Sequence, residues 1–253
     1  MKVSIITTCF NREKTIRDSI ESVLSQDYQN IEYILIDGAS TDKSVEIINE
    51  YKEKIATFVS EPDKGMYEAI NKGIRSATGD IVGLLHSDDI LYASNTISHI
   101  VKRFEETDSE LVYGNGLFVD CKNINKITRQ WISGKYNKNK VKKGWLPLHP
   151  TVYMRKCCFA QIGYYDESFK IAADSDFLVR CLYKSNFKIS YLDEYIVRMR
   201  MGGASTSFNK TIIKWKEDMR MYKNNGFNPY ISLPLKVLSK IPQFIHAKSK
   251  LRK

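Results

Sequence analysis

Short apolar runs alternate with amphipathic stretches along the first part of the chain. Four of these runs predict β-strands, at residues 3–8, 31–36, 55–59 and 81–85. The stretches between them carry apolar residues at helical spacing, and the last of them predicts a helix over residues 66–77. Because strands and helices alternate, the pattern predicts an α/β fold with a parallel, doubly wound sheet and right-handed crossovers.

The regular alternation stops after residue 107. Two strands are expected at residues 111–113 and 117–119, joined by a hairpin-like turn at Gly114–Gly116. A basic segment at residues 135–143 is expected to be a loop, and residues 199–207 are expected to form a glycine-containing lid. The other elements predicted here are strands at 126–132, 151–155 and 187–192 and helices at 157–162, 171–182 and 208–225.

This change of pattern predicts three parts. Residues 1–107 would form a nucleotide-binding half, and residues 108–207 would form a mixed α/β half of the same domain. Residues 208–253 would form a helical, basic tail.

The tail carries most of the excess positive charge. From Met219 to Lys253 there are eight Lys or Arg residues and no Asp or Glu, out of a net charge of +10 for the chain. A basic segment with apolar residues suits an anionic membrane surface, whereas a nucleic-acid binder more often spreads its charge over a folded face. We therefore expect no nucleic-acid partner and peripheral membrane contact through the tail, with a disordered solubilising tail as the alternative.

The cysteines and the hydropathy pattern indicate a cellular compartment. The five cysteines include no Cys-x-x-Cys pair and are odd in number, which argues against a disulfide framework and a structural zinc site. A strand begins directly after Met1, and no apolar run approaches the ~20 residues of a membrane span. A cytoplasmic protein is expected, peripheral on the inner face of the cytoplasmic membrane where the tail binds lipid.

Acidic residues follow two of the predicted parallel strands. Asp88 and Asp89 follow the uncharged run at residues 81–85, and Asp37 follows the second strand. Ligands of open α/β sheets bind at this carboxyl edge. Adjacent carboxylates repel unless a cation holds them, and oxygen ligands suit Mn²⁺ or Mg²⁺. A solvated loop or helix cap for the pair, and a plain turn residue for Asp37, are the alternatives.

Other polar residues are candidates for the chemistry. Asp174 opens a predicted helix and is a candidate general base, with Asp176 as the alternate base and a plain N-cap as the alternative role. His86 and His149 are candidates for acceptor or phosphate contact, or for structural hydrogen bonding. The chain has neither a Gly-x-Gly-x-x-Gly motif after the first strand nor a P-loop, so a metal at Asp89 would neutralise a bound phosphate.

Taken together, these segments resemble the family 2 glycosyltransferases, which are inverting enzymes with the GT-A fold. The resemblance runs from about residue 2 to residue 207. The segments that carry it are residues 3–11, 36–42, 71–73, 77–80 and 85–89, followed by Asp174 and Arg180. It implies a Rossmann-like, mostly parallel central sheet with flanking helices and an acceptor-side mixed α/β subregion.

The resemblance also implies a role for each matched residue. Thr8 and Phe10 would flank the base of the nucleotide and Asp37 would hydrogen-bond it, while Asp63 and Lys64 would help to hold the donor. Asp88 would contact the ribose or the donor sugar. Asp89 would ligate a divalent metal, Mn²⁺ or Mg²⁺, that bridges the diphosphate. Asp174 would be the general base. Where this chain has His86, the family commonly has an acid, which leaves metal ligation to Asp89 with help from Asp88.

The implied activity is transfer of a sugar with inversion, from a nucleotide-sugar to a hydroxyl of a glycan or lipid-linked acceptor. UDP is the nucleotide that the resemblance favours. The motifs at residues 36–42, 61–65 and 202–205 look like a bacterial branch that builds surface polysaccharide of the cell envelope. A nucleotidyltransferase and a catalytically inactive sugar-nucleotide-binding module are the alternatives, although the former should show a glycine- and arginine-rich loop after the first strand.

Overall fold

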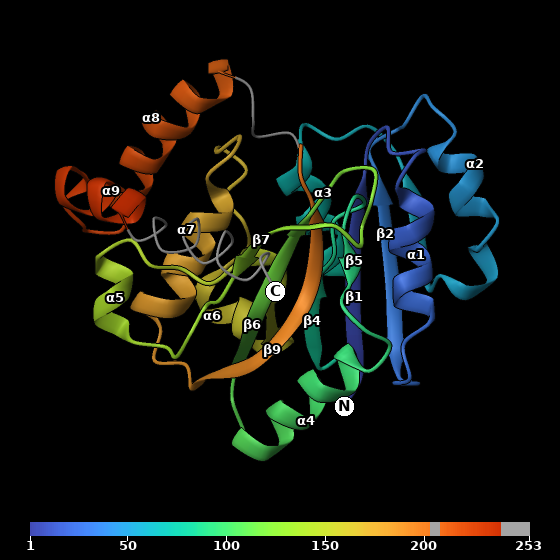
Figure 1. Cartoon of the computed structure of the whole chain (residues 1–253), viewed down its shortest axis with the longest axis horizontal. Coiled ribbons are helices and arrows are strands. Elements are labelled where there is room, and N and C mark those ends of the chain that lie inside the picture. The colour runs from blue at the N-terminus through green and yellow to red at the C-terminus, as the bar shows by residue number, and fades with distance from the viewer. Residues whose placement is uncertain (203–207, 239–253) are drawn as a thin grey trace.

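A computed structural model describes residues 1–202 and 208–238 of the chain (Figure 1). The first apolar runs form parallel strands. The strand β1 (Val3–Cys9) pairs with β2 (Ile31–Asp37) on one side and with β4 (Ile81–Leu84) on the other, and β2 pairs with β3 (Thr57–Ser60). All three pairings are parallel, so the doubly wound arrangement predicted for this part is confirmed.

Helices cover both faces of these strands. Neighbouring residues of β1 point to opposite faces, since Ile6 lies in one buried cluster and Ile5 in the other. The cluster with Ile6 takes its helical side chains from the α3 side, including Ile70 and Ile74, and the cluster with Ile5 takes them from the α1 side. The helices of this half are α1 (Ile16–Leu24), α2 (Ser44–Asn49), α3 (Met66–Ser76) and α4 (Thr96–Thr107).

The second half continues the same sheet with mixed pairing. The strand β8 (Val152–Arg155) pairs antiparallel with β4 and with β6 (Leu111–Val119), and so joins the two halves. The long strand β9 (Ile189–Arg200) pairs parallel with β6 and antiparallel with the short β5 (Ile90–Leu91). The order is β3-β2-β1-β4-β8-β6-β9-β5, with β7 (Ile127–Trp131) antiparallel to β6.

The expected turn at Gly114–Gly116 is wrong, because these residues lie inside the continuous strand β6. Their glycines serve close packing. A Cβ on Gly114 would lie 2.6 Å from Cγ1 of Ile196, and one on Gly116 would lie 2.3 Å from Cδ2 of Leu148. The register with β9 also shifts here, so these residues mark an irregularity in the ladder.

Two further expectations need correction. The basic segment at 135–143 contains a helix, α5 (Lys138–Lys142), where the side chain of Asn137 accepts a hydrogen bond from the backbone N–H of Asn139. The strand β9 runs eight residues further than the predicted 187–192, so the proposed lid begins inside a strand. Residues 203–207 of that lid lie outside the described residues.

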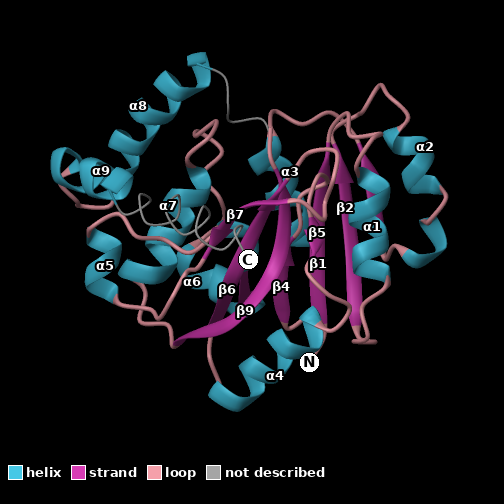
Figure 2. Cartoon of the chain, viewed as in Figure 1, coloured by secondary structure: helices cyan, strands magenta, loops and turns pink. Residues whose placement is uncertain are grey.

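The remaining helices gather beside the strands of the second half. They are α6 (Phe159–Ile162), α7 (Ala173–Val179) with its π-helical continuation (Arg180–Lys184), α8 (Phe208–Asn224) and α9 (Pro229–Leu238). Helices α8 and α9 lie at the end of the molecule opposite α2, next to α5 and α7 (Figures 1 and 2). Within the described ranges, no helix combines the length and the apolar character that crossing a membrane requires.

Candidate active site

Asp37 lies at the carboxyl end of β2 and is completely buried. Its carboxylate accepts hydrogen bonds from the backbone N–H of Ser40 at 2.9 Å, from the hydroxyl of Ser40 at 2.5 Å and from the hydroxyl of Ser60 at 2.7 Å. Asp37 therefore fixes the loop after β2 and the end of β3 relative to each other. Thr8, which is half-buried, faces Ile36 across the β1–β2 pair, close to the same edge.

Phe10, Gly38 and Asp63 come together at this edge. A Cβ on Gly38 would lie 3.5 Å both from Cδ2 of Phe10 and from Oδ2 of Asp63, so Gly38 lies within van der Waals range of both side chains. The ring of Phe10 is 59% exposed although it follows a buried strand, as a ring that stacks on a ligand would be. Lys64, beside Asp63, is exposed, and its backbone N–H donates to Glu68.

A lysine of α3 holds Asp63 in place. Nζ of Lys72 lies 2.6 Å from Oδ1 of Asp63 and 2.7 Å from Oε1 of Glu61, and these neighbours raise the pKa of Lys72. The side chain of Asp63 is only 6% exposed. The sequence motif at residues 71–73 contained this lysine, but its spacing gave no sign that it faces Asp63 across the loop.

Asp89 follows β4 and is 2% exposed. Its Oδ1 accepts a hydrogen bond from the backbone N–H of Arg200 at 3.3 Å, whereas its buried Oδ2 has no hydrogen-bond partner in the part of the chain that is described. Burial and the neighbouring charge of Asp88 raise its pKa well above the usual range. An unpartnered, buried carboxylate oxygen is costly, and a bound cation would remove that cost.

These residues fit a divalent metal that is held mainly by its substrate. Among the residues placed in the structure, no three His, Cys, Asp or Glu side chains form a ready-made metal cage. Mg²⁺-type ions are commonly bound by one or two carboxylates together with substrate phosphates and water. Asp89 supplies such a carboxylate at the sheet edge.

A cleft of about 400 Å³ opens beside Asp88. Its walls come from the start of α1, the loop after β2, the β6–β7 connection and the end of β9. The guanidinium of Arg200 donates to the backbone oxygen of Asp88 at 2.9 Å and also contacts Asp18 of α1. The lining includes Asn11, Arg12, Asp42, Asp88, Cys121 and Arg200.

Asp174 lies near His86 and His149. Its charge acts on both His86 and His149, and the charge of Asp88 also acts on His86. The two imidazole rings are 6.1 Å apart between centroids. Asp174 sits in the first turn of α7, where its Oδ1 accepts from the backbone N–H of Ser175 at 2.6 Å. The structure therefore brings Asp88 and Asp174 to the same region although 86 residues separate them in the chain.

Both histidines are neutral at pH 7. Burial lowers the pKa of His149 to about 4 and lowers that of His86 as well. Nε2 of His149 lies 2.7 Å from the hydroxyl oxygen of Tyr165, which forms a hydrogen bond. A neutral imidazole beside Asp174 offers one donor and one acceptor to a sugar hydroxyl.

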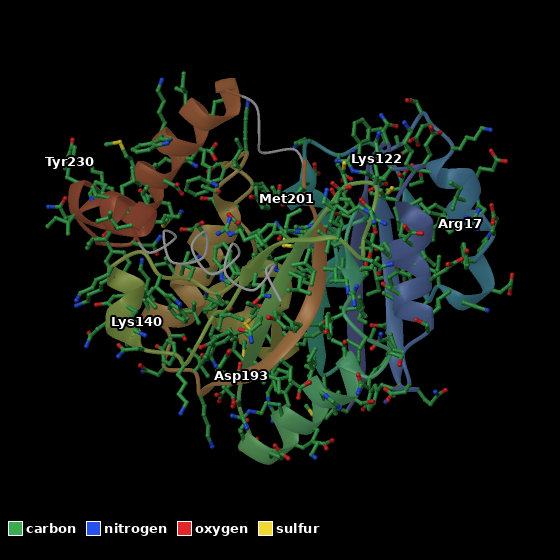
Figure 3. The ribbon with its side chains drawn as sticks, viewed as in Figure 1. Arg17, Lys122, Lys140, Asp193, Met201 and Tyr230 are labelled. Carbon is green, nitrogen blue, oxygen red and sulfur yellow. The ribbon has the colours of Figure 1, made fainter. Side chains whose placement is uncertain are left out.

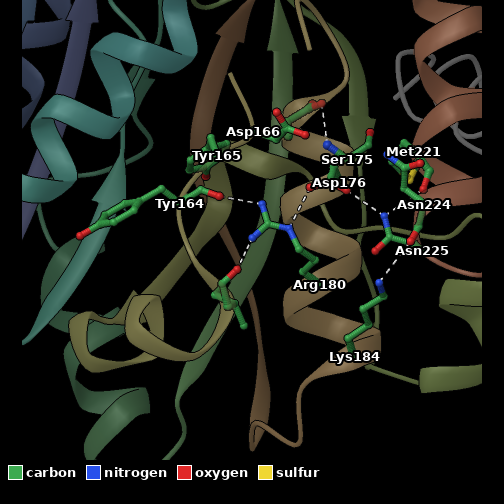
Figure 4. Close-up of polar contacts among 12 residues, drawn as sticks. Tyr164, Tyr165, Asp166, Ser175, Asp176, Arg180, Lys184, Met221, Asn224 and Asn225 are labelled. Carbon is green, nitrogen blue, oxygen red and sulfur yellow. Dashed lines mark hydrogen bonds and ion pairs between the residues drawn. The ribbon is translucent and has the colours of Figure 1, made fainter. Parts of the chain in front are cut away.

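Asp176 is engaged elsewhere (Figure 4). It is 6% exposed, its Oδ2 accepts from Nε of Arg180 at 2.8 Å, and its Oδ1 accepts from Nδ2 of Asn225 at 2.8 Å. Arg180 also donates to the backbone oxygens of Ile162 and Tyr164. These contacts connect α7 with the segment after α6 and with the residue that follows α8. Both oxygens of Asp176 are engaged by other side chains, so Asp174 is the better candidate for a base in the first turn of α7.

Comparison with known proteins agrees with this geometry. The family model described as glycosyl transferase family 2 matches residues 4–169. A PGL/p-HBAD biosynthesis glycosyltransferase of Mycobacterium bovis is 26% identical over 217 residues, covering 83% of this chain and 82% of that protein. An uncharacterised glycosyltransferase of Mycobacterium tuberculosis is 34% identical over 186 residues, covering 70% of this chain and 68% of that protein.

Solved structures support the fold. TarS 1–349 of S. aureus, in complex with UDP-GlcNAc, matches with a TM-score of 0.68 and 21% identity, over 98% of this chain and 79% of that chain. The mannosyltransferase PcManGT of Pyrobaculum calidifontis, in complex with GDP-Man and Mn²⁺, matches with a TM-score of 0.65 and 16% identity, over 97% and 73%. This chain thus has the GT-A fold, and it belongs to glycosyl transferase family 2 as a glycosyltransferase.

Proposed function

We propose that this glycosyltransferase moves a sugar from a nucleotide-sugar, UDP-linked, to a hydroxyl of a glycan or lipid-linked acceptor, with inversion at the anomeric carbon. The observation that supports it most is that the charges of Asp88 and Asp174 both act on His86, while the next residue after Asp88, Asp89, has a buried and unpartnered carboxylate oxygen. A proton acceptor at Asp174 and a cation ligand at Asp89 would then serve one reaction.

The nucleotide binds across the carboxyl ends of β1 and β2 in this proposal. The base stacks on the exposed ring of Phe10 beside Thr8, with Asp63 next to Gly38, while the buried Asp37 fixes the loop after β2. Asp37 is fixed by hydrogen bonds from Ser40 and Ser60, and Asp63 is fixed by its ion pair with Lys72. These two acids therefore keep their positions without ligand. Lys64, exposed beside Asp63, is within the same loop and approaches the donor from outside.

The diphosphate extends toward Asp88 and Asp89. A divalent metal held at Asp89 supplies positive charge that stabilises the departing nucleoside diphosphate. Asp88 faces the ribose or the donor sugar. Arg200 holds the backbone at Asp88 and Asp89, so the two carboxylates keep their positions relative to β9.

Asp174 takes the proton of the acceptor hydroxyl. The hydroxyl oxygen forms a bond to the anomeric carbon while the bond from that carbon to the diphosphate oxygen breaks, so the configuration inverts. His86 and His149, both neutral, orient the acceptor by hydrogen bonds rather than by charge. Asp176 has no part in this step because Arg180 and Asn225 occupy its oxygens.

The acceptor belongs to bacterial surface polysaccharide biosynthesis in this proposal. The motifs of residues 36–42 and the named biosynthetic relative support that assignment. A lipid-linked acceptor would require contact with a membrane surface. Exposed apolar side chains on the two C-terminal helices support such contact: Ile212, Ile213, Trp215, Tyr230, Ile231, Val237 and Leu238.

The experiment is a donor screen with active-site variants. The protein is incubated with Mn²⁺ and UDP-, GDP- and dTDP-sugars, and release of nucleoside diphosphate is measured. We expect slow release from a UDP-sugar that Asp89→Ala and Asp174→Asn each abolish. Asp108→Asn is the matched control, because its side chain is 87% exposed and a C-terminal αL residue tolerates Asn. Release that survives Asp89→Ala contradicts the assigned site.

The same screen separates the alternatives. A nucleotidyltransferase would release pyrophosphate from a nucleoside triphosphate and a sugar phosphate. An inactive binding module would be stabilised thermally by a nucleotide-sugar without releasing diphosphate.

A further inference from the structure

We propose that Glu217, on α8, is a positioning residue that sets the place of Asp174. This inference rests on the proposed role of Asp174 as the base. It concerns a part of the chain beyond the residues 4–169 that match the family model.

The carboxylate of Glu217 binds three consecutive backbone N–H groups. Its Oε1 accepts from Lys170 at 2.8 Å, and its Oε2 accepts from Ile171 at 2.8 Å and from Ala172 at 3.0 Å. Helix α7 begins at the next residue, and Asp174 is its second residue. One side chain, 43 positions after Asp174, therefore fixes the peptide that leads into the base.

The opposite side of this peptide is fixed by α3. The hydroxyl of Tyr67 donates to the backbone oxygen of Ile171 at 2.6 Å. The side chain of Tyr67 is 4% exposed and lies near Asp174, whose charge raises its pKa along with burial. The segment before α7 is thus held between a donor on α3 and an acceptor on α8, which leaves its backbone little freedom.

Other side chains of α8 and α9 also contact residues close to Asp174. Nη2 of Arg220 donates to the hydroxyl of Ser168 at 2.8 Å, and its guanidinium lies 3.8 Å from the ring centroid of Phe169. Asn225 donates to Asp176 (Figure 4). Nζ of Lys236 lies 3.4 Å from the hydroxyl oxygen of Ser175. The C-terminal helices accordingly contact both sides of Asp174 in sequence.

Among these residues, Glu217 affects the position of Asp174 most directly. Charge-assisted bonds from one carboxylate to three N–H groups are strong, and they act on the backbone rather than on a side chain. A general base must lie within hydrogen-bond reach of the acceptor hydroxyl, so a shift of the backbone at Ala172 moves it out of reach. A glutamine at position 217 keeps one acceptor oxygen but places an NH2 group where the other oxygen accepts, so at least one of the three N–H groups loses its acceptor.

The test compares Glu217→Gln with Lys216→Gln in the full-length chain. Lys216 is the adjacent, exposed residue of the same helix and serves as the matched control. Amide hydrogen exchange of a peptide spanning residues 170–176 is measured without ligand, with a β1 peptide as reference. Release of UDP from UDP-GlcNAc with Mn²⁺ is measured per UDP-binding site, and the sites are counted by calorimetric titration with UDP.

We expect Glu217→Gln to speed exchange at residues 170–176, to keep the affinity for UDP and to lower turnover per site about tenfold. Counting sites removes any loss that arises only from misfolded protein. Unchanged exchange, or unchanged turnover per site, overturns the inference. If the amide variant does not fold, Glu217→Asp, which keeps the charge but has a shorter reach, is measured in the same way against the same criteria.

Failure of the proposed function gives a different result. If the wild-type protein releases no UDP from any UDP-sugar, the proposed function is wrong, and if Asp174→Asn turns over as fast as wild type, the role of Asp174 is wrong. If Asp174→Asn is inactive while Glu217→Gln is fully active per site, only the positioning role is wrong.

Discussion

The backbone N–H of Arg200 donates a hydrogen bond to Oδ1 of Asp89, with 3.3 Å between nitrogen and oxygen, although 111 residues separate the two in the chain. The same arginine binds the backbone oxygen of Asp88 through its guanidinium. The end of β9 therefore holds the acidic loop after β4 in place, while the second oxygen of Asp89 remains without a protein partner among the described residues. Figure 3 labels Met201, the next residue, in the upper central part of the view, and its side chain is 46% exposed.

Replacing Asp89 by asparagine should separate metal binding from folding. The carboxylate is buried, and its raised pKa shows that its charge is unfavourable in the free protein, so Asp89→Asn should fold with undiminished stability. Mn²⁺ should raise the affinity of wild type for UDP, and this gain should be at least roughly tenfold smaller in the variant. Loss of a residue that only contacts a metal ligand already costs about that much in metal affinity. Calorimetric titration with and without Mn²⁺ measures the gain, with Asp108→Asn as control. An undiminished Mn²⁺ effect would contradict the role of Asp89.

Stability should depend on pH through His149. Its pKa in the folded protein, about 4, is below the ordinary value, so protons bind more tightly to the unfolded chain. The contribution of His149 to the free energy of unfolding should be fully present above pH 6.5 and should be lost as the pH falls from 6.5 to about 4, by about 1.4 kcal/mol per pH unit at most. Urea unfolding at several pH values measures this slope, and His149→Gln should flatten it in part, since the pKa of His86 is lowered too.

Lys72→Gln should weaken nucleotide binding with little effect on folding. The lysine holds Asp63 beside Phe10 and Gly38, so the loop after β3 should lose its fixed position in the variant. The side chain of Lys72 is partly exposed to solvent, which weakens its ion pair with Asp63. We therefore expect the Kd for UDP to rise only about twofold to fivefold. Lys102→Gln on α4, a 73% exposed lysine, is the control. Equal Kd values for the two variants would show that Lys72 does not support the nucleotide site.

Membrane contact should depend on exposed apolar residues of α8 and α9 and not on the whole C-terminal segment. Deleting residues 230–253 would remove Lys236, which is buried in an ion pair with Asp218, and Leu233, which packs in the core. Trp215→Ser and Tyr230→Ser remove exposed surface only, since these side chains are 51% and 77% exposed.

Co-sedimentation with vesicles tests this contact. The wild-type chain should bind vesicles rich in anionic lipid more than zwitterionic ones, and the Trp215→Ser, Tyr230→Ser double variant should bind less. Lys216→Gln should reduce binding only slightly. Binding that is the same in wild type and double variant would exclude these helices as the contact.

The alternation of strands and helices in residues 1–107 could be predicted from local pattern because each strand is followed within a few residues by its own helix. Asp37 and Asp89 could be assigned to one edge of the sheet in the same way, since parallel strands bring their carboxyl ends to one edge. For Gly114–Gly116 the local pattern led to a wrong prediction, a turn in place of a strand. Glycines commonly signal a turn, but here they accommodate Ile196 and Leu148 from distant segments, which a local pattern does not show.

The contacts that fix the site were not predictable for the same reason. The bonds from Arg200 to Asp88 and Asp89, and from residues 170–172 to Glu217, join segments that are distant in the chain, and no spacing signals them. The helical pattern of residues 208–225 predicted α8 correctly. It did not show that this helix faces α7. Lys236 belongs to the basic tail that was expected to contact a membrane, but its side chain is buried in an ion pair with Asp218.

The link between Glu217 and the peptide before Asp174 has a consequence for synthesis on the ribosome. The nascent chain completes β1 to β4 by residue 84, but the acceptor of the N–H groups at 170–172 emerges only with α8. Because N-terminal parts fold first during translation, the nucleotide side forms well before the base is held in place. We expect a chain that stalls after residue 200 to form strands β1 to β4 but to transfer sugar inefficiently. Incomplete chains would then consume little of the cell's activated sugars.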